Sequence, residues 1–200
     1  MIKPEWTSKE WHNNHFPENQ LDLEGDTWGK RWRGMEKMRY ETYLKLIKED
    51  LQSSHSLKIL DIGCALCDFT VKAWELNRNN QIWGMDISDN AIAWVTENFP
   101  NFNFKTAAIP DIPFDVKFDI VLCLETLYYT DQKRKTLENI RDSLVPSGML
   151  VFSGNLNARD GYFTVAEQFR VRLIETKEKQ VVYVVTWDRV NTLAFRRIFS

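Results

Sequence analysis

Between residues 57 and 154 the chain alternates short apolar runs with helix-like segments, and this alternation limits the fold more than any other feature. Short apolar runs bounded by turn residues are typical of buried strands, whereas the segments between them place apolar residues at helical spacing. Strands that alternate with helices pair in parallel through βαβ crossovers, and ligands bind at the carboxyl ends of such strands. The predicted fold class is therefore α/β.

The expected elements follow from this pattern. Strands are predicted over residues 57–61, 82–86, 102–105, 118–123 and 149–152, and helices over 34–51, 69–77, 89–98 and 132–144. Asp68 and either Ser88 or Asp89 are suitable N-caps for two of these helices. Near the end of the chain we expect a helix around 164–175, then strands over 181–187 and 193–199 that are close enough to pair antiparallel.

The composition is that of an ordinary globular protein. The 200 residues carry 26 Lys and Arg against 28 Asp and Glu, a formal net charge of −2, and three cysteines. This balance supplies no basic field for holding duplex nucleic acid, and no run approaches the ~20 apolar residues of a membrane-spanning helix. The few cysteines and the lack of a leader-like start predict a cytoplasmic protein with neither nucleic acid nor membrane as partner. One domain is expected, with an N-terminal arm over 1–33 and a core over 34–200.

The first predicted strand ends in a turn with the features of a nucleoside site. Gly63 and small neighbours allow a backbone to approach a ligand closely, and the helix beyond presents unpaired N–H groups. The second strand ends in Asp86, 23 residues after Gly63, where a carboxylate can accept hydrogen bonds from both hydroxyls of a ribose. Each feature alone has a structural explanation, since glycine shapes turns and aspartate caps helices.

The order and spacing of these motifs resemble those of the class I S-adenosylmethionine-dependent methyltransferases. Asp61-Ile-Gly63-Cys64-Ala65-Leu-Cys67 is similar to the first motif of that family, and Asp86 to the acid that ends its second strand. Ile112-Pro-Phe, Phe118-Asp-Ile-Val and Leu144-Val-Pro-Ser-Gly-Met-Leu are similar to its later segments, so the resemblance covers about residues 57–154. It implies a three-layer Rossmann-like sandwich with a mostly parallel seven-stranded sheet, an antiparallel last strand, and S-adenosyl-L-methionine as cofactor.

The resemblance also implies which residues bind the cofactor. Asp86 would hold the ribose hydroxyls, Ile87 would pack on the adenine, and the turn would hold the methionine half. The expected cofactor-binding residues are Arg39, Tyr40, Asp61, Gly63, Cys64, Ala65, Asp86, Ile87, Ala108, Ile109, Cys123 and Leu124. Ala65 and Cys67 replace the second and third glycines of the family motif, and Ala108 replaces a frequent Asp beside the adenine. Asp111 or backbone would then hold the adenine amine, and a non-catalytic nucleoside-binding protein stays open as an alternative.

Three further segments resemble the small nodulation protein S-like N-methyltransferases, which act on an amino-sugar oligosaccharide. They are Asp26-Thr-Trp-Gly, Glu36-x-x-Arg39-Tyr40 and Glu125-Thr-Leu-Tyr128-Tyr129. The resemblance implies that Arg39 pairs with the methionine carboxylate of the cofactor and that Tyr40 packs beside it, although Arg39 also fits a solvated helix charge. The expected acceptor is a small molecule, with nitrogen preferred and oxygen second.

Methyl transfer to such an acceptor needs alignment and desolvation more than an elaborate set of catalytic groups. Glu125, Tyr128 and Tyr129 follow the fourth predicted strand, where the acceptor would approach. Glu125 is the candidate for orienting the acceptor or taking its proton. The tyrosines would shape the pocket or place electron-rich faces near the sulfonium. All three also fit a purely structural role.

Other motifs support rival functions less well. Cys64-Ala-Leu-Cys67 opens a helix after a strand, as in a thiol oxidoreductase, but the acids and strands around it are not needed there. A nicotinamide dehydrogenase would need G-x-G-x-x-G, of which only Gly63 is present. His12 and His15 lack further ligands, so we predict surface residues and no metal site. The tryptophans of the arm predict either packing or a lid over the cofactor mouth.

Overall fold

The computed structural model describes most of the predicted core and part of the arm. It covers residues 7–16, 41, 43–45, 47–49, 51–52, 55–154, 170–177 and 180–186. For Ser147, Gly154 and the last two ranges only the backbone is described. The predicted residues Arg39 and Tyr40 and the strand expected over 193–199 lie outside the described residues.

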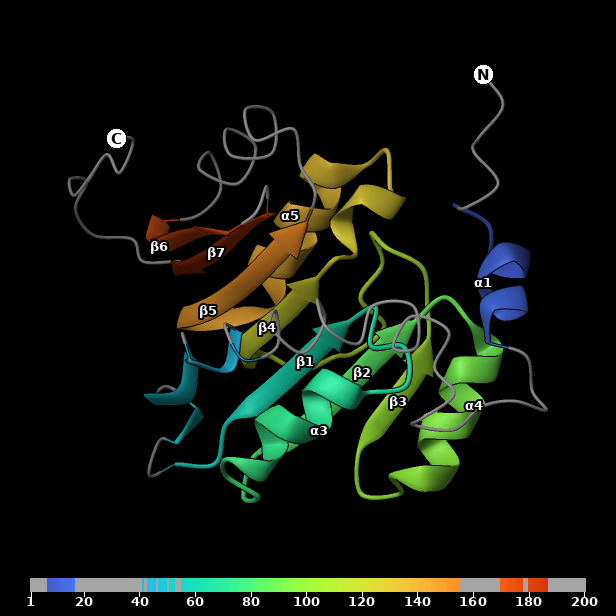
Figure 1. Cartoon of the computed structure of the whole chain (residues 1–200), viewed down its shortest axis with the longest axis horizontal. Coiled ribbons are helices and arrows are strands. Elements are labelled where there is room, and N and C mark those ends of the chain that lie inside the picture. The colour runs from blue at the N-terminus through green and yellow to red at the C-terminus, as the bar shows by residue number, and fades with distance from the viewer. Residues whose placement is uncertain are drawn as a thin grey trace.

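A seven-stranded sheet forms the centre of the molecule, in the order β3-β2-β1-β4-β5-β7-β6. Its strands are β1 (Lys58–Ile62), β2 (Gln81–Asp86), β3 (Asn103–Thr106), β4 (Phe118–Leu124), β5 (Leu144–Gly154), β6 (Arg170–Lys177) and β7 (Gln180–Thr186). The first five strands pair in parallel, and β7 is antiparallel to both β5 and β6 (Figure 1). The α/β prediction, the seven-stranded sheet and its antiparallel last strand are therefore confirmed.

Helices connect and cover these strands. They are α1 (Lys9–His15), α3 (Asp68–Glu75), α4 (Asp89–Asn98), the short 3-10 helix η2 (Leu127–Tyr129) and α5 (Lys133–Ser143). The described residues between 41 and 51 are helical, as the apolar spacing predicts. Ser88 is the N-cap of α4, its Oγ accepting a hydrogen bond from Ala91 N at 3.2 Å. Among the helices that the structure describes, none is long and apolar enough to cross a membrane.

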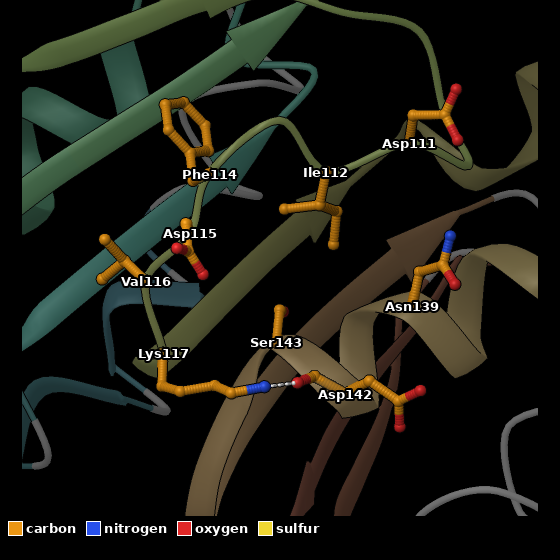
Figure 2. A pocket seen from close by; sticks show the side chains of 9 residues that line it. All are labelled: Asp111, Ile112, Phe114, Asp115, Val116, Lys117, Asn139, Asp142 and Ser143. Atoms are coloured by element: carbon orange, nitrogen blue, oxygen red, sulfur yellow. Dashed lines mark hydrogen bonds between the residues drawn. The ribbon is translucent and has the colours of Figure 1, made fainter.

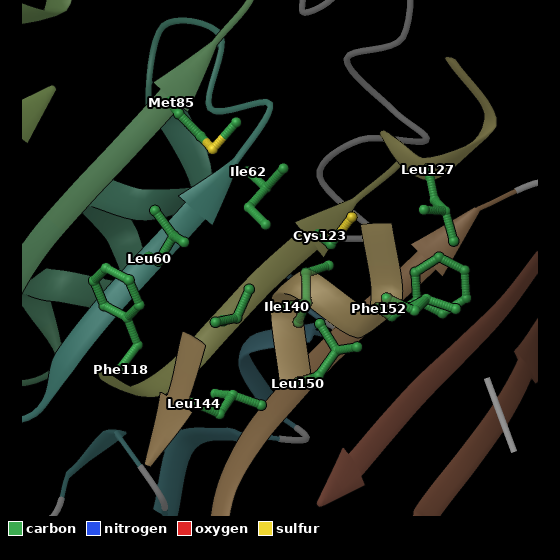
Figure 3. Packing of buried hydrophobic residues seen from close by; sticks show 12 residues of the cluster. Leu60, Ile62, Met85, Phe118, Cys123, Leu127, Ile140, Leu144, Leu150 and Phe152 are labelled. Atoms are coloured by element: carbon green, nitrogen blue, oxygen red, sulfur yellow. The ribbon is translucent and has the colours of Figure 1, made fainter. Parts of the chain in front are cut away.

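Two hydrophobic clusters cover the opposite faces of the sheet, because successive side chains of a strand point to opposite sides. Leu60 belongs to the cluster on the α5 side, which includes Phe118, Ile140 and Phe152 (Figure 3). Its neighbour Ile59 belongs to the other cluster, under α3 and the described helical residues between 41 and 51. The result is the expected three-layer arrangement, with both faces of the sheet buried.

The helix expected around 164–175 is wrong over residues 170–175, because β6 occupies residues 170–177, and residues 164–169 lie outside the described residues. Val171, Leu173 and Ile174 fit helical spacing, but two of them lie two residues apart, as strand residues also do. Pairing of β6 with β7 over most of its length decides the outcome in favour of strand. The N-cap of α3 is also shifted, from the predicted Asp68 to Cys67.

Candidate functional site

The turn after β1 has left-handed backbone at three alternate positions. Gly63 has a φ of 76°, Ala65 of 47° and Cys67 of 65°. The N–H groups of Gly63 and Cys64 donate to Met85 O of β2 at 2.8 and 3.0 Å. Left-handed backbone costs an L-residue roughly 1–2 kcal/mol, which glycine avoids. Ala65 and Cys67 therefore adopt the conformation favourable to glycine at the positions where the family motif has glycine.

Gly63 is also enclosed by the loop after β4. A Cβ at this position would overlap Thr126 Oγ1 and lie 2.7 Å from Thr126 Cγ2, well inside van der Waals contact. The Thr126 hydroxyl lies 3.0 Å from both Ile62 O and Leu124 O, and its single hydrogen is donated to one of them at a time. The ends of β1 and β4 thus come into close contact through a residue without a side chain.

Asp86 joins this turn to the turn after β2. Asp86 is 8 % exposed, and its Oδ2 accepts a hydrogen bond from Ala65 N at 3.0 Å. Its Oδ1 accepts from Ser88 N at 2.9 Å. Burial raises the pKa of Asp86, and these two backbone hydrogen bonds oppose the rise. A carboxylate has about four lone-pair sites, so Asp86 can also accept hydroxyl hydrogens.

Asp61 lies deeper in the same region and holds the turn to α3. It is 6 % exposed, and Thr70 Oγ1 of α3 donates a hydrogen bond to its Oδ2. Burial, together with the negative charge of Asp86, raises the pKa of Asp61 from 3.8 to about 7, while the Thr70 hydrogen bond lowers it. Its described hydrogen bond joins the end of β1 to α3, so Asp61 supports the turn from within the core.

The raised pKa of Asp61 predicts a pH-dependent stability. Folded Asp61 binds its proton more tightly than unfolded Asp61. The stabilisation that Asp61 contributes to the free energy of unfolding is therefore lost as pH rises from about 4 to about 7. The slope reaches at most about 1.4 kcal/mol per pH unit. Asp61→Asn removes this contribution. The free energy of unfolding of the wild type minus that of the variant, measured by urea titration, should therefore fall as pH rises from about 4 to about 7. Parallel stability curves for the two proteins would contradict the assignment.

All three cysteines are buried, and the described structure contains them as free thiols. A hydrogen bond with the Cys67 thiol and burial raise the pKa of Cys64 well above its usual range. Burial raises the pKa of Cys123 to about 12. A redox-active thiol needs the opposite shift, because the thiolate is the nucleophile. These environments disfavour the thiol oxidoreductase alternative.

Glu125 follows β4 in a strained backbone conformation, with a φ of 54°. Its N–H donates to Ser153 O at 2.9 Å. Its carboxylate Oε1 accepts hydrogen bonds from Ser153 Oγ at 3.1 Å and from Tyr43 OH at 3.5 Å. Both hydroxyl-bearing residues are fully buried, and left-handed non-glycine residues cluster at functional sites. Tyr43 and Ser153 are therefore residues of the candidate site that the sequence analysis missed.

The two predicted tyrosines lie side by side on η2. The rings of Tyr128 and Tyr129 are 4.5 Å apart, and both side chains are half-buried. Burial raises the pKa of Tyr129, which keeps its hydroxyl protonated. Tyr129 is therefore a hydrogen-bond donor rather than a base. Cys123 is fully buried in the core cluster (Figure 3), whereas Leu124 is half-buried at the end of β4.

The loops after β2 and β3 lie next to each other. Ala107 N donates to Asp86 O at 2.9 Å, which brings the segment containing Ala108 and Ile109 to the Asp86 side of the sheet. Ala108 is exposed, and Ile87 and Ile109 are half-buried. The residues predicted to surround an adenine are thus beside Asp86.

Helix α1 packs against the same edge and corrects one prediction. His12 is buried, at 9 % exposure, where we expected a surface residue. Phe16 is 2 % exposed and packs with Leu66 and Ala91. Ser88 Oγ and Asn13 Oδ1 are hydrogen-bonded at 2.9 Å, which fastens α1 to the N-terminal end of α4 (Figure 1).

A separate cavity of about 370 Å³ lies between the β3–β4 connection and α5 (Figure 2). Its walls are Asp111, Ile112, Phe114, Asp115, Val116, Lys117, Asn139, Asp142 and Ser143. Apart from Asp111, the alternative partner for the adenine amine, it contains none of the residues predicted for the cofactor. Within the described residues no cluster of three metal-ligating side chains occurs.

The sheet order, the left-handed turn after β1 and the carboxylate at the end of β2 together define a class I methyltransferase fold. Residues 60–150 match the family model described as a methyltransferase domain. This match spans just under half of the chain, and over it the chain is similar to the class I S-adenosylmethionine-dependent methyltransferases, whose cofactor is S-adenosyl-L-methionine.

Similar proteins differ in what they act on. The chain is 25 % identical over 125 residues to a ubiquinone biosynthesis O-methyltransferase of Rickettsia bellii, covering 58 % of this chain and 49 % of that protein. It is 28 % identical over 172 residues to a tRNA U34 carboxymethyltransferase of Campylobacter fetus, covering 76 % and 58 %. The chain thus spans about half the length of the curated relatives that it matches.

Among solved structures, the fold is similar to that of the N-methyltransferase NodS from Bradyrhizobium japonicum WM9 in complex with S-adenosyl-L-homocysteine. The TM-score is 0.67 at 18 % sequence identity, covering 87 % of this chain and 98 % of the other. At this identity the likeness establishes the fold alone.

Proposed function

We propose that this chain transfers a methyl group from S-adenosyl-L-methionine to a nitrogen of a small molecule. An amino sugar or another natural-product intermediate is the preferred acceptor, and a hydroxyl oxygen is the second choice. The observation that carries this proposal is the arrangement of two acids at one edge of the sheet. Asp86 ends β2 and holds the turn after β1, while Glu125 follows β4 and is fixed by two buried hydroxyls.

The cofactor would lie along this edge. Asp86 would bind the ribose hydroxyls, with Ile87, Ala108 and Ile109 around the adenine. The backbone of the turn, with Gly63, Cys64 and Ala65, would contact the methionine half, with Leu124 opposite. Arg39 and Tyr40 would bind its carboxylate end, and Asp61 and Cys123 would support the site from within the core. The bound cofactor supplies an electrophilic methyl group on a positive sulfonium.

Glu125 would orient the acceptor and hold its proton. The hydroxyls of Tyr43 and Ser153 both donate to Oε1 of this carboxylate. We therefore assign Oε2 to the N–H or O–H of the acceptor. A fixed carboxylate also attracts a protonated amine, which must lose a proton before its nitrogen can attack. Tyr128 and Tyr129 would form the wall of the acceptor pocket, with the Tyr129 hydroxyl as a donor.

We further propose one methyltransferase domain over residues 1–200, with the arm 1–33 acting as a lid on the core 34–200. The position of α1 supports this proposal, because Asn90 Nδ2 of α4 donates to Phe16 O at 2.9 Å and Lys9 pairs with Asp89 at 3.1 Å. A helix held across the site edge would exclude water from the reacting atoms.

An acceptor screen with methyl-labelled S-adenosylmethionine tests the proposed function. Amino sugars, their N-acylated oligomers, small phenols and alcohols, and unmodified tRNA form the panel. We expect label on an amine, with N-acylated nitrogens unlabelled because they lack a free lone pair. The relative that acts on tRNA makes nucleic acid the second candidate, and labelled tRNA with unlabelled small molecules would replace our proposal.

Glu125→Gln should lower single-turnover methylation by roughly a hundredfold, because general base catalysis typically contributes that much or more. The amide keeps the shape of the side chain and still accepts hydrogen bonds from Tyr43 and Ser153. Affinity for S-adenosylhomocysteine should change little. Glu75→Gln at the end of α3 is the matched control, with unchanged turnover. A Glu125→Gln protein as fast as wild type at neutral pH would remove the proposed role.

A further inference from the structure

His12 occupies an unexpected place for a residue of the N-terminal arm. Its ring centroid lies 5.0 Å from that of Tyr129, in an edge-to-face arrangement with an interplanar angle of 72°. Asn13, the next residue, is hydrogen-bonded through Oδ1 to Ser88 Oγ at 2.9 Å, and Ser88 N donates to Asp86 Oδ1 at 2.9 Å. A positive charge on His12 lowers the pKa of Asp86, which agrees with this proximity. The ring of Trp11 also contacts His12, at 5.0 Å. His12 therefore contacts Tyr129 after β4 and lies near the end of β2.

This position follows from the way in which α1 is anchored. His12 and Phe16 are four residues apart, so they project from the same side of the helix. Phe16 packs on Leu66 of the turn after β1, which directs that side of α1 toward the site edge. Asn90 Nδ2 and Ser88 Oγ hold the end of the helix through Phe16 O and Asn13.

The chemistry of a ribose explains what an imidazole would contribute here. Each ribose hydroxyl has one hydrogen to donate and lone pairs that accept. The carboxylate of Asp86 only accepts, so it satisfies the hydroxyl hydrogens and leaves the hydroxyl oxygens without a donor. A ring N–H of histidine is such a donor. Asp86 and His12 are thus complementary partners for one pair of hydroxyls.

We propose that His12 is a cofactor-binding residue that closes the nucleoside site from the side of α1 and donates a hydrogen bond to a ribose hydroxyl. This inference rests on the proposed function, because it uses the same nucleoside site at Asp86. The arm then belongs to the cofactor site itself.

The test is calorimetric titration of the full chain with S-adenosylhomocysteine and with its 2′-deoxy and 3′-deoxy analogues. His12→Phe keeps a ring against Tyr129 but has no N–H, and we expect it to weaken S-adenosylhomocysteine roughly five- to thirtyfold. Binding of the analogue that lacks the contacted hydroxyl should be the same in wild type and variant. His12→Gln, which retains a donor, should recover part of the affinity, and His15→Phe on the same helix should bind as wild type.

The outcomes distinguish a failure of the His12 proposal from a failure of the proposed function on which it rests. Equal losses for the parent ligand and both analogues would show that His12 only supports α1, and undiminished affinity in His12→Phe would show no contact, so either result overturns the inference. Hydrogen exchange over residues 9–15 checks that α1 remains docked in each variant. A wild-type protein that binds neither S-adenosylhomocysteine nor S-adenosylmethionine would overturn the nucleoside site itself.

Discussion

Asp86→Ala should weaken S-adenosylhomocysteine binding roughly a hundredfold or more. Hydrogen bonds to a charged carboxylate contribute about 1.5–3 kcal/mol each, and the proposed site makes two of them to the ribose. The substitution also removes the acceptor of Ala65 N and Ser88 N, so part of the loss comes from a disturbed turn. Calorimetry measures the affinity, and chemical denaturation without ligand measures the cost to the fold.

Asp86→Asn separates these two effects. Its amide oxygen keeps one acceptor in the buried position, so the turn is disturbed less, while the charge that strengthens the ribose contact is lost. Asp119→Asn is the matched control, because Asp119 also accepts a backbone hydrogen bond, from Lys58 N at 2.8 Å, at the start of β4. Unchanged affinity in both Asp86 variants would remove Asp86 from the ribose site.

Gly63→Ala should destabilise the protein by about 2–5 kcal/mol and abolish detectable cofactor binding. The new methyl group overlaps Thr126 Oγ1 and meets Thr126 Cγ2 at 2.7 Å, and the left-handed backbone at a φ of 76° adds strain. Overpacking costs typically 1–3 kcal/mol, and the backbone conformation roughly 1–2 kcal/mol more. Urea unfolding measures the first effect, and titration with S-adenosylhomocysteine measures the second.

The Thr126→Ala background identifies the cause of this loss. With the Thr126 side chain shortened, Gly63→Ala no longer meets Oγ1 or Cγ2, and its cost should fall to the backbone strain and the remaining 3.1 Å contact with the Cβ of residue 126. A double-mutant cycle therefore predicts a favourable coupling between the two substitutions. Purely additive effects would mean that Gly63 is required for its backbone conformation and not for its contact with the loop after β4.

Local signals predict the elements that form by themselves. Helix α4 begins and ends as expected over 89–98, because Ser88 caps it and apolar residues repeat on one face. The helix prediction failed over residues 170–175 because β6 depends on its pairing with β7, a contact that no local pattern encodes. Strand pairing also explains why β5 begins at Leu144, five residues before its predicted start at 149, because Leu144 pairs with Phe118 of β4.

The candidate site also contains residues that local motifs predict and residues that only the folded structure brings together. Gly63 and Asp86 carry their chemistry in short motifs at strand ends, so residue type and spacing suffice to predict both. Tyr43 and Ser153 were missed because they approach Glu125 from 82 and 28 residues away in the sequence. His12 was misjudged because its burial depends on the docking of α1 against Leu66 and Ala91, which residue spacing alone does not reveal.

The central claim is that the carboxyl edge of this sheet binds S-adenosylmethionine. Calorimetric titration of the reduced 200-residue chain with S-adenosylmethionine and S-adenosylhomocysteine tests it most directly, with NAD as the control ligand. Our account predicts one site that binds both sulfur nucleosides and does not bind NAD. Absence of binding by either sulfur nucleoside, or binding of NAD alone, would contradict it.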